Sequence, residues 1–70
     1  MSNYVAIIEK SRTGFSAYVP DLPGCFAAAS SLAEIKTLIR STVVFHVECL
    51  REEGQPIPEP SIAAVVEVTA

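Results

Sequence analysis

The stretch GFSAYVPDLPGCFAAASSLAE, Gly14 to Glu34, decides the fold of this chain. At its centre stands PDLPG, Pro20 to Gly24, whose two prolines and terminal glycine interrupt regular pairing and favour a fixed turn. The residues before the turn, Phe15 to Val19, alternate between two faces as a strand does. The residues after it, Cys25 to Ala29, predict another strand, and their alanines indicate that something packs closely over it.

A long amphipathic helix is predicted to follow this stretch. Ser31 can cap its first N–H groups, and Glu34, three residues later, completes a capping box. The helical pattern runs to about Glu53 and ends at Gly54, which is soon followed by Pro56. One apolar stripe at helical spacing is formed by Leu32, Ile35, Ile39, Val43, His46 and Leu50.

A second stripe on the same helix is formed by Leu38, Phe45 and Cys49. One sheet face cannot cover both stripes, so the second stripe is a candidate contact with another copy of the chain. The alternative is that the C-terminal segment folds back over it. Half of the 70 residues are hydrophobic, and a chain this short needs additional stabilisation, which favours assembly into a dimer or tetramer.

Two more strands are predicted, one at each end of the sequence. Asn3 to Glu9 is apolar on both faces, which is typical of a central strand, and Lys10 to Gly14 fits a hairpin turn. QPIPEP, Gln55 to Pro60, should be extended, and IAAVVEV, Ile62 to Val68, predicts a final strand. The length predicts one domain over residues 1–70.

The expected fold class is therefore α+β, with elements in the order β-β-β-α-β. Three antiparallel strands come first, and the long helix packs on one face of their sheet. The fourth strand should lie parallel to the first, because crossover connections of this kind are right-handed. The other face of the sheet is left bare within one copy, which is a second reason to expect assembly.

Composition and charge exclude several classes of protein. The net charge is −3 and the five basic residues are scattered, which argues against direct nucleic-acid binding and suits a basic partner. Two cysteines and one histidine match neither a disulfide framework nor a zinc site, so no metal or cofactor is expected. The sequence shows no signal-peptide pattern and no apolar run of membrane length, which predicts a cytoplasmic protein.

The residues also predict no catalytic site. A two-metal nuclease needs several converging carboxylates, whereas the first predicted strand carries no acid in its middle. A nucleophile needs a neighbouring base, and His46, the only histidine, falls on the helix stripe that should face the sheet. No third group is evident that would orient His46 against Cys25. The chain is therefore expected to be a binding module and not an enzyme.

The sequence from Gly14 to Glu34 resembles the HicB antitoxin family, which typically shows the pattern "GF.A..PDLPGC.A.G.T..EA". In that family an apolar strand precedes the pattern, and a long helix ending in acidic residues and Gly follows it, before "PIPEPS". Here YVAIIE stands at Tyr4 to Glu9, and FHVECLREEGQPIPEPS stands at Phe45 to Ser61. The similarity covers nearly the whole chain in the same order.

This resemblance implies a degraded RNase H-type fold without nuclease activity, in a protein that assembles as dimers or larger oligomers. It implies as partner a HicA-like toxin, a small basic ribonuclease whose active surface the antitoxin masks. The acidic groups that would meet such a toxin are Asp21, Glu48, Glu52 and Glu53. Pro20, Pro23 and Gly24 are predicted to shape the turn between the strands, and the alternative is that they contact the toxin.

The sequence departs from many family members, which carry a C-terminal helix-turn-helix or ribbon-helix-helix domain that binds DNA. It ends two residues after the last predicted strand, so no separate DNA-binding domain and no operator binding are expected. One alternative is an orphan HicB-like domain that serves as an oligomeric scaffold or binds a small ligand. The other is an enzyme, either a residual nuclease or a hydrolase that depends on Cys25.

Overall fold

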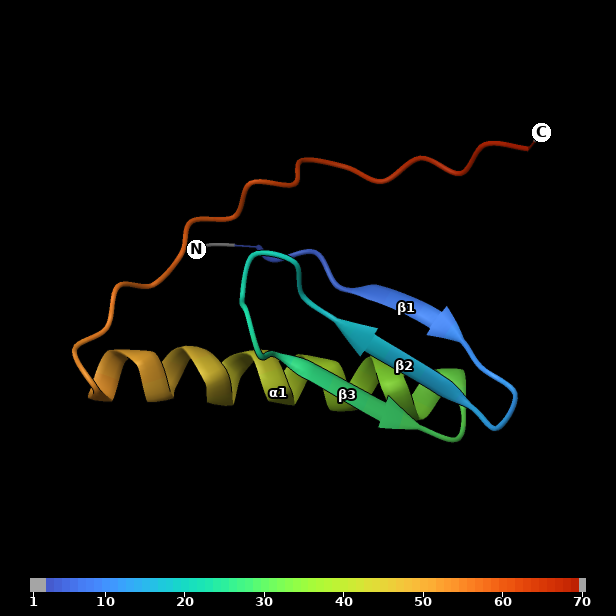
Figure 1. The fold of residues 1–70 in the computed structure, drawn as a ribbon, viewed down its shortest axis with the longest axis horizontal. Helices are drawn as coiled ribbons and strands as arrows, with labels where there is room; N and C mark the ends of the chain where they lie inside the picture. The colour runs from blue at the N-terminus through green and yellow to red at the C-terminus, as the bar shows by residue number, and fades with distance from the viewer. Residues whose placement is uncertain (1–2, 70) are drawn as a thin grey trace.

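A three-stranded antiparallel sheet with one long helix packed against it makes up the fold. The computed structural model describes residues 3–69. The strands are β1 (Ile7–Lys10), β2 (Phe15–Tyr18) and β3 (Phe26–Ala29), and they lie in the order β1-β2-β3. The helix α1 (Leu32–Glu52) contacts β3 and β2, and the C-terminal segment lies on the opposite side, beyond β1 (Figure 1). The α+β class, the antiparallel strands and the long helix agree with the sequence predictions.

The PDLPG turn joins β2 to β3 and reaches into the core. Its chain reversal is closed by main-chain hydrogen bonds from Val19 N to Cys25 O (3.1 Å) and from Cys25 N to Leu22 O (3.0 Å). The Leu22 side chain is only 1% exposed. Gly24 has a φ of +85°, which a residue with a side chain rarely adopts. The turn therefore fills part of the core with the Leu22 side chain. This burial explains the leucine of the motif, and the positive φ explains its glycine.

The core lies between the sheet and the first apolar stripe of α1. Ala17 of β2 pairs with Ile8 of β1 and with Ala27 of β3, so these three side chains share the face that α1 covers. The small alanines let the helix approach closely, and Ile35 of α1 is completely buried there. The buried residues of this core are Ala17, Val19, Leu22, Cys25, Ile35 and Ile39.

Both ends of α1 lie where the sequence predicts them. The Ser31 hydroxyl accepts a hydrogen bond from the Glu34 amide at 3.1 Å, which is the predicted N-cap. At the other end, the Gln55 amide donates to the Leu50 carbonyl at 2.9 Å, and Gly54 has a φ of +69°. A glycine in this conformation is the usual way to end a helix.

The predicted fourth strand over Ile62–Val68 does not form in this structure. Residues 55–69 follow α1 as a segment without regular secondary structure. Within residues 3–69, no main-chain hydrogen bond joins 62–69 to the sheet. Figure 1 shows the segment on the β1 side of the sheet and apart from the strands, so the expected fourth strand parallel to the first is absent. The crossover rule fixes the direction of a strand that joins a sheet, but it does not provide the hydrogen bonds.

The prediction that the first strand is central is wrong for the same reason. In the described sheet β1 pairs with β2 alone and is therefore an edge strand. It is also shorter than predicted, because β2 ends at Tyr18, before Pro20, and leaves residues 3–6 without a partner strand. β1 is thus an apolar strand with one unpaired edge.

We predict that Ile35→Val lowers the free energy of unfolding by about 0.5–1.5 kcal/mol, because it removes a methyl group from a fully buried position. Urea denaturation followed by circular dichroism measures this change. Val44→Ala, at an exposed position of the same helix, is the control and should change stability by less than about 0.5 kcal/mol. Equal effects of the two substitutions would contradict the packing described here.

Candidate interaction surface

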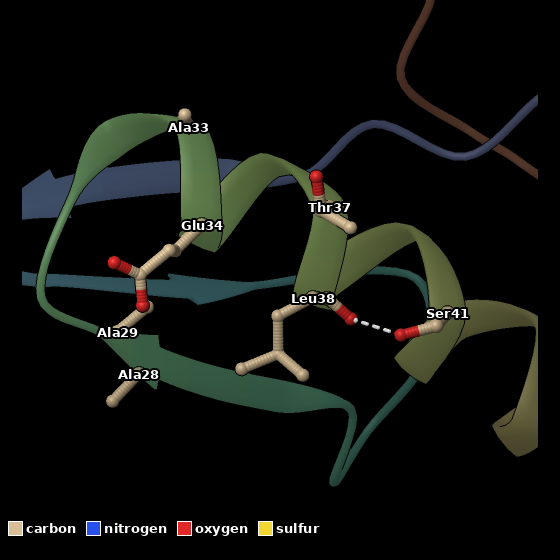
Figure 2. A pocket seen from close by; sticks show the side chains of 7 residues that line it. All are labelled: Ala28, Ala29, Ala33, Glu34, Thr37, Leu38 and Ser41. Atoms are coloured by element: carbon tan, nitrogen blue, oxygen red, sulfur yellow. Dashed lines mark hydrogen bonds between the residues drawn. The ribbon is translucent and has the colours of Figure 1, made fainter.

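An open groove runs between the N-terminal half of α1 and β3. Its volume is about 530 Å³, and most of its lining is apolar. Figure 2 shows the Leu38 side chain pointing from α1 toward β3. The Ser41 hydroxyl donates to the Leu38 carbonyl at 2.9 Å, so it is satisfied within the helix. The residues that line the groove are Ala28, Ala29, Ala33, Glu34, Thr37, Leu38 and Ser41.

The second apolar stripe of α1 continues this groove toward the end of the helix. Leu38 is 40% exposed and Phe45, two turns later, is 68% exposed, while Cys49 is partly buried. The C-terminal segment leaves these residues uncovered, since it lies on the β1 side of the sheet (Figure 1). The alternative that this segment folds back over the stripe is therefore wrong. We call the groove together with Phe45 and Cys49 the β3-side surface.

Acidic side chains border the β3-side surface. Glu34 lines the groove, and Glu48 and Glu52 are exposed at three and seven positions after Phe45, which places them beside it on the helix. The negative end of the helix dipole adds to their field. Glu53 is the C-cap residue and is also exposed, one position further. The structure thus brings Glu48 and Glu52 next to the apolar stripe, an arrangement that suits a basic partner.

The basic residues of α1 occupy the opposite flank. Arg40 lines a second hollow together with Val43, and this hollow faces Tyr4 and Ala6 on the β1 side. Lys36 lies one turn before Arg40 and is exposed on the same flank. The charges of the helix are therefore separated, with acids toward β3 and bases toward β1.

Asp21 has an internal role that the sequence did not reveal. Its carboxylate accepts hydrogen bonds from the Ser61 amide, at 2.9 Å, and from the Ser61 hydroxyl. The Ser61 hydroxyl, followed by the Ser61 amide, holds the pKa of Asp21 below its ordinary value. Nearby, the Tyr4 hydroxyl donates to the Pro58 carbonyl. These two contacts, which we call the tail latch, fix the start of the C-terminal segment beside the PDLPG turn.

The outer face of the sheet carries a row of apolar side chains. Strand register places Ile7, Tyr18 and Phe26 opposite one another, and Phe26 is 69% exposed. The sequence indicated that this face is bare, but the alignment of these three residues depends on register. Alternation alone does not give the register, because it identifies the face of a residue and not its neighbour on the next strand.

Cys25 and His46, the two residues considered for nucleophilic catalysis, lie in surroundings that do not favour that chemistry. Burial raises the pKa of the Cys25 thiol, which disfavours the thiolate that a nucleophile requires. His46 is partly buried beside Gly24, as expected for a residue on the sheet-facing stripe. Within residues 3–69, no three His, Cys, Asp or Glu side chains gather where they could hold a metal ion. Over the same residues, no helix has the length and hydropathy needed to cross a membrane.

We predict that the tail latch opens in acid. A carboxyl group whose pKa is lowered by folding stabilises the folded arrangement above its unfolded pKa, and this stabilisation is lost as the pH falls through the folded pKa. The Ser61 amide resonance should titrate with Asp21, with a midpoint below 3.8. Asp21→Asn should remove the titration, while Glu59→Gln should leave it unchanged. A midpoint at or above 3.8 in the unsubstituted chain would contradict the latch.

Comparisons with curated proteins give two relatives of this chain. One is an uncharacterised 14.9 kDa protein from the rep-hol intergenic region of Haemophilus phage HP1, which is 36% identical over 56 residues. That match covers 80% of this chain and 42% of the phage protein, so the chain spans less than half of this relative. The other is a UPF0150 protein of Synechocystis, which is 30% identical over 61 residues, covering 86% of this chain and 77% of that protein.

Comparisons with solved structures and family models agree with each other. A chain in a HicA3 and HicB3 toxin–antitoxin complex matches with a TM-score of 0.73 and 37% identity, over 84% of this chain and 70% of that one. The crystal structure of antitoxin HicB3 matches with a TM-score of 0.67 and 38% identity, over 81% of this chain and 42% of that one. The model of the HicB-like antitoxins of bacterial toxin–antitoxin systems matches residues 4–69. The chain therefore belongs to the HicB-like antitoxin family.

Proposed function

We propose that this chain is the antitoxin of a toxin–antitoxin pair, that it resides in the cytoplasm, and that it acts by binding a small basic HicA-like ribonuclease. The observation that carries the proposal is the match to a chain of the HicA3 and HicB3 complex, at 37% identity over 84% of this chain. The exposed apolar and acidic residues of the β3-side surface offer a place for such a partner.

The β3-side surface suits a toxin better than it suits a second copy. Phe45 provides an exposed aromatic side chain of the kind that anchors protein interfaces. Glu48 and Glu52 beside it would attract basic groups and repel the same acids of another copy. We therefore assign Leu38, Phe45 and Cys49, together with Glu48, Glu52 and Glu53, to the toxin contact. A contact of Asp21 with the toxin stays a prediction, because its carboxylate already binds Ser61.

The proposed mechanism requires no chemistry from this chain. Apolar contacts around Phe45 would exclude water, and the acidic border would pair with basic groups that the toxin otherwise uses to hold RNA. An RNA strand and the antitoxin would then compete for one surface. Inhibition in this scheme is stoichiometric and weakens as salt is added, because part of the attraction is electrostatic.

Self-association through the same surface is the competing use. In that case the chain is an orphan domain without a toxin, and it serves as an oligomeric scaffold. An orphan domain could also bind a small ligand in the apolar groove. The exposure of Leu38 and Phe45 fits either occupant, and the acids beside them favour the toxin.

The first test is affinity purification of the tagged chain from its native cell lysate, followed by mass spectrometry. We expect a small basic protein in stoichiometric amount, and we expect the purified chain to stop that protein from cleaving RNA. Recovery of this chain alone would contradict the antitoxin function and favour the orphan domain.

The second test locates the contact on the recovered partner. Glu48→Lys combined with Glu52→Lys should weaken binding by roughly tenfold or more, because two attractive charges become repulsive. Glu9→Lys, at an exposed position of β1, is the matched control and should bind within about twofold of the unsubstituted chain. Calorimetric titration measures both. If Phe45→Lys lowers the molar mass of the isolated chain and leaves partner binding unchanged, the surface serves self-association.

A further inference from the structure

We propose that the toxin adds an extended segment to the open edge of β3, and that alternate side chains of this segment enter the groove between β3 and α1. The inference rests on the proposed antitoxin function and deepens it, since it states which main-chain groups of this chain hold the partner. The segment that fits this edge is apolar and carries at least one lysine or arginine.

The outer edge of β3 is unpaired and unprotected. In the order β1-β2-β3, β3 pairs with β2 alone. Natural proteins blunt such edges with lysine, proline, a bulge or a covering segment. The four residues of β3, FAAA, contain neither a charge nor a proline, and the C-terminal segment lies on the β1 side (Figure 1). The other edge strand, β1, ends in two charged residues, so β3 is the edge more open to an added strand.

The strand register identifies the main-chain groups that face this open edge. The Val19 amide donates to the Cys25 carbonyl, so every second residue of β3 after Cys25 also directs its main-chain groups toward β2. Phe26 and Ala28, which alternate with those residues, direct theirs away from β2. Both residues are exposed, and within residues 3–69 no main-chain hydrogen bond outside the ladder uses them. Each therefore offers one N–H donor and one C=O acceptor to an added strand.

The groove beside this edge has space for side chains of the added strand. Successive side chains of a strand point to opposite faces, so every second one would point toward α1 and over the groove of about 530 Å³. Ala29 and Ala33 are small residues of its lining, and Leu38 points from α1 toward β3 (Figure 2). In strand addition, main-chain hydrogen bonds give affinity and such pockets give specificity, here for apolar side chains.

Charge favours a segment of the toxin over a segment of a second copy. Glu34 lines the groove and Glu48 is exposed farther along the β3-side surface, so the edge suits a segment with a basic residue. The strand-forming segments that a second copy could bring have no excess of base. β3 is uncharged, β1 carries one acid and one base, and the only charge of Ile62–Val68 is Glu67.

Hydrogen exchange tests the edge directly, with the small basic protein recovered by affinity purification as the probe. In the free chain the Ala27 and Ala29 amides should be protected, because they face β2, while the Phe26 and Ala28 amides should exchange freely. Binding of the probe should slow exchange of the Phe26 and Ala28 amides by about tenfold or more.

The other outcomes of this experiment separate the two proposals. Binding of the probe without protection of Phe26 and Ala28 would overturn strand addition and leave the antitoxin function standing. If no partner binds, both proposals fail. Protection that grows with the concentration of the isolated chain would assign the edge to a second copy and overturn strand addition by the toxin.

A proline substitution at the edge provides the second readout. Ala28→Pro removes an outward N–H group, at the kind of position where a sheet tolerates proline, and should weaken binding by roughly tenfold or more. Ala28→Thr keeps the N–H group and is the matched control, with an affinity within about twofold of the unsubstituted chain. Calorimetric titration measures both, and circular dichroism shows whether they fold. Equal affinities of the two folded variants would refute the proposal, and if Ala28→Pro does not fold, the exchange pattern decides.

Discussion

The burial of Leu22 by the PDLPG turn is the constraint on which the rest of the structure depends. Val19 and Cys25, on either side of the turn, are buried with it, so the turn closes one end of the core as it reverses the chain. The reversal sets β3 against β2 and delivers the chain to the start of α1. The same turn places Gly24 beside His46 and carries Asp21 to Ser61. A single loop thus couples the sheet, the helix and the C-terminal segment.

This coupling also explains why two separate motifs occur in one sequence. PDLPG and PIPEPS are distant along the chain, yet Asp21 of the first binds Ser61 of the second. In the sequence, the two motifs are separate parts of the family pattern. In the structure the two motifs contact each other. The carboxylate on the turn accepts hydrogen bonds from the extended segment, which forms no main-chain hydrogen bonds to the described sheet.

The parts of the fold that local chemistry determines were predicted from the sequence, and the parts that depend on distant pairing were not. Ser31, Gly54 and the PDLPG turn act over a few residues, so the limits of α1 and the β2–β3 reversal could be predicted. The pattern of Ile62–Val68 predicts a strand equally well, but a strand forms only when another edge is within reach. The exposed flank with Leu38 and Phe45 was predictable from helical periodicity. The internal role of Asp21 was not, since neither charge nor spacing distinguishes it from Glu48.

The size of the core links these surfaces to stability. Within residues 3–69, the buried core contains six residues, and two of them are the small residues Ala17 and Cys25, so hydrophobic burial within one copy is small. Any partner that binds the folded chain raises its stability by mass action. The acidic residues of α1 toward β3 and the unpaired edge of β1 lie at opposite edges of the described sheet, so a partner at one edge would leave the other edge free.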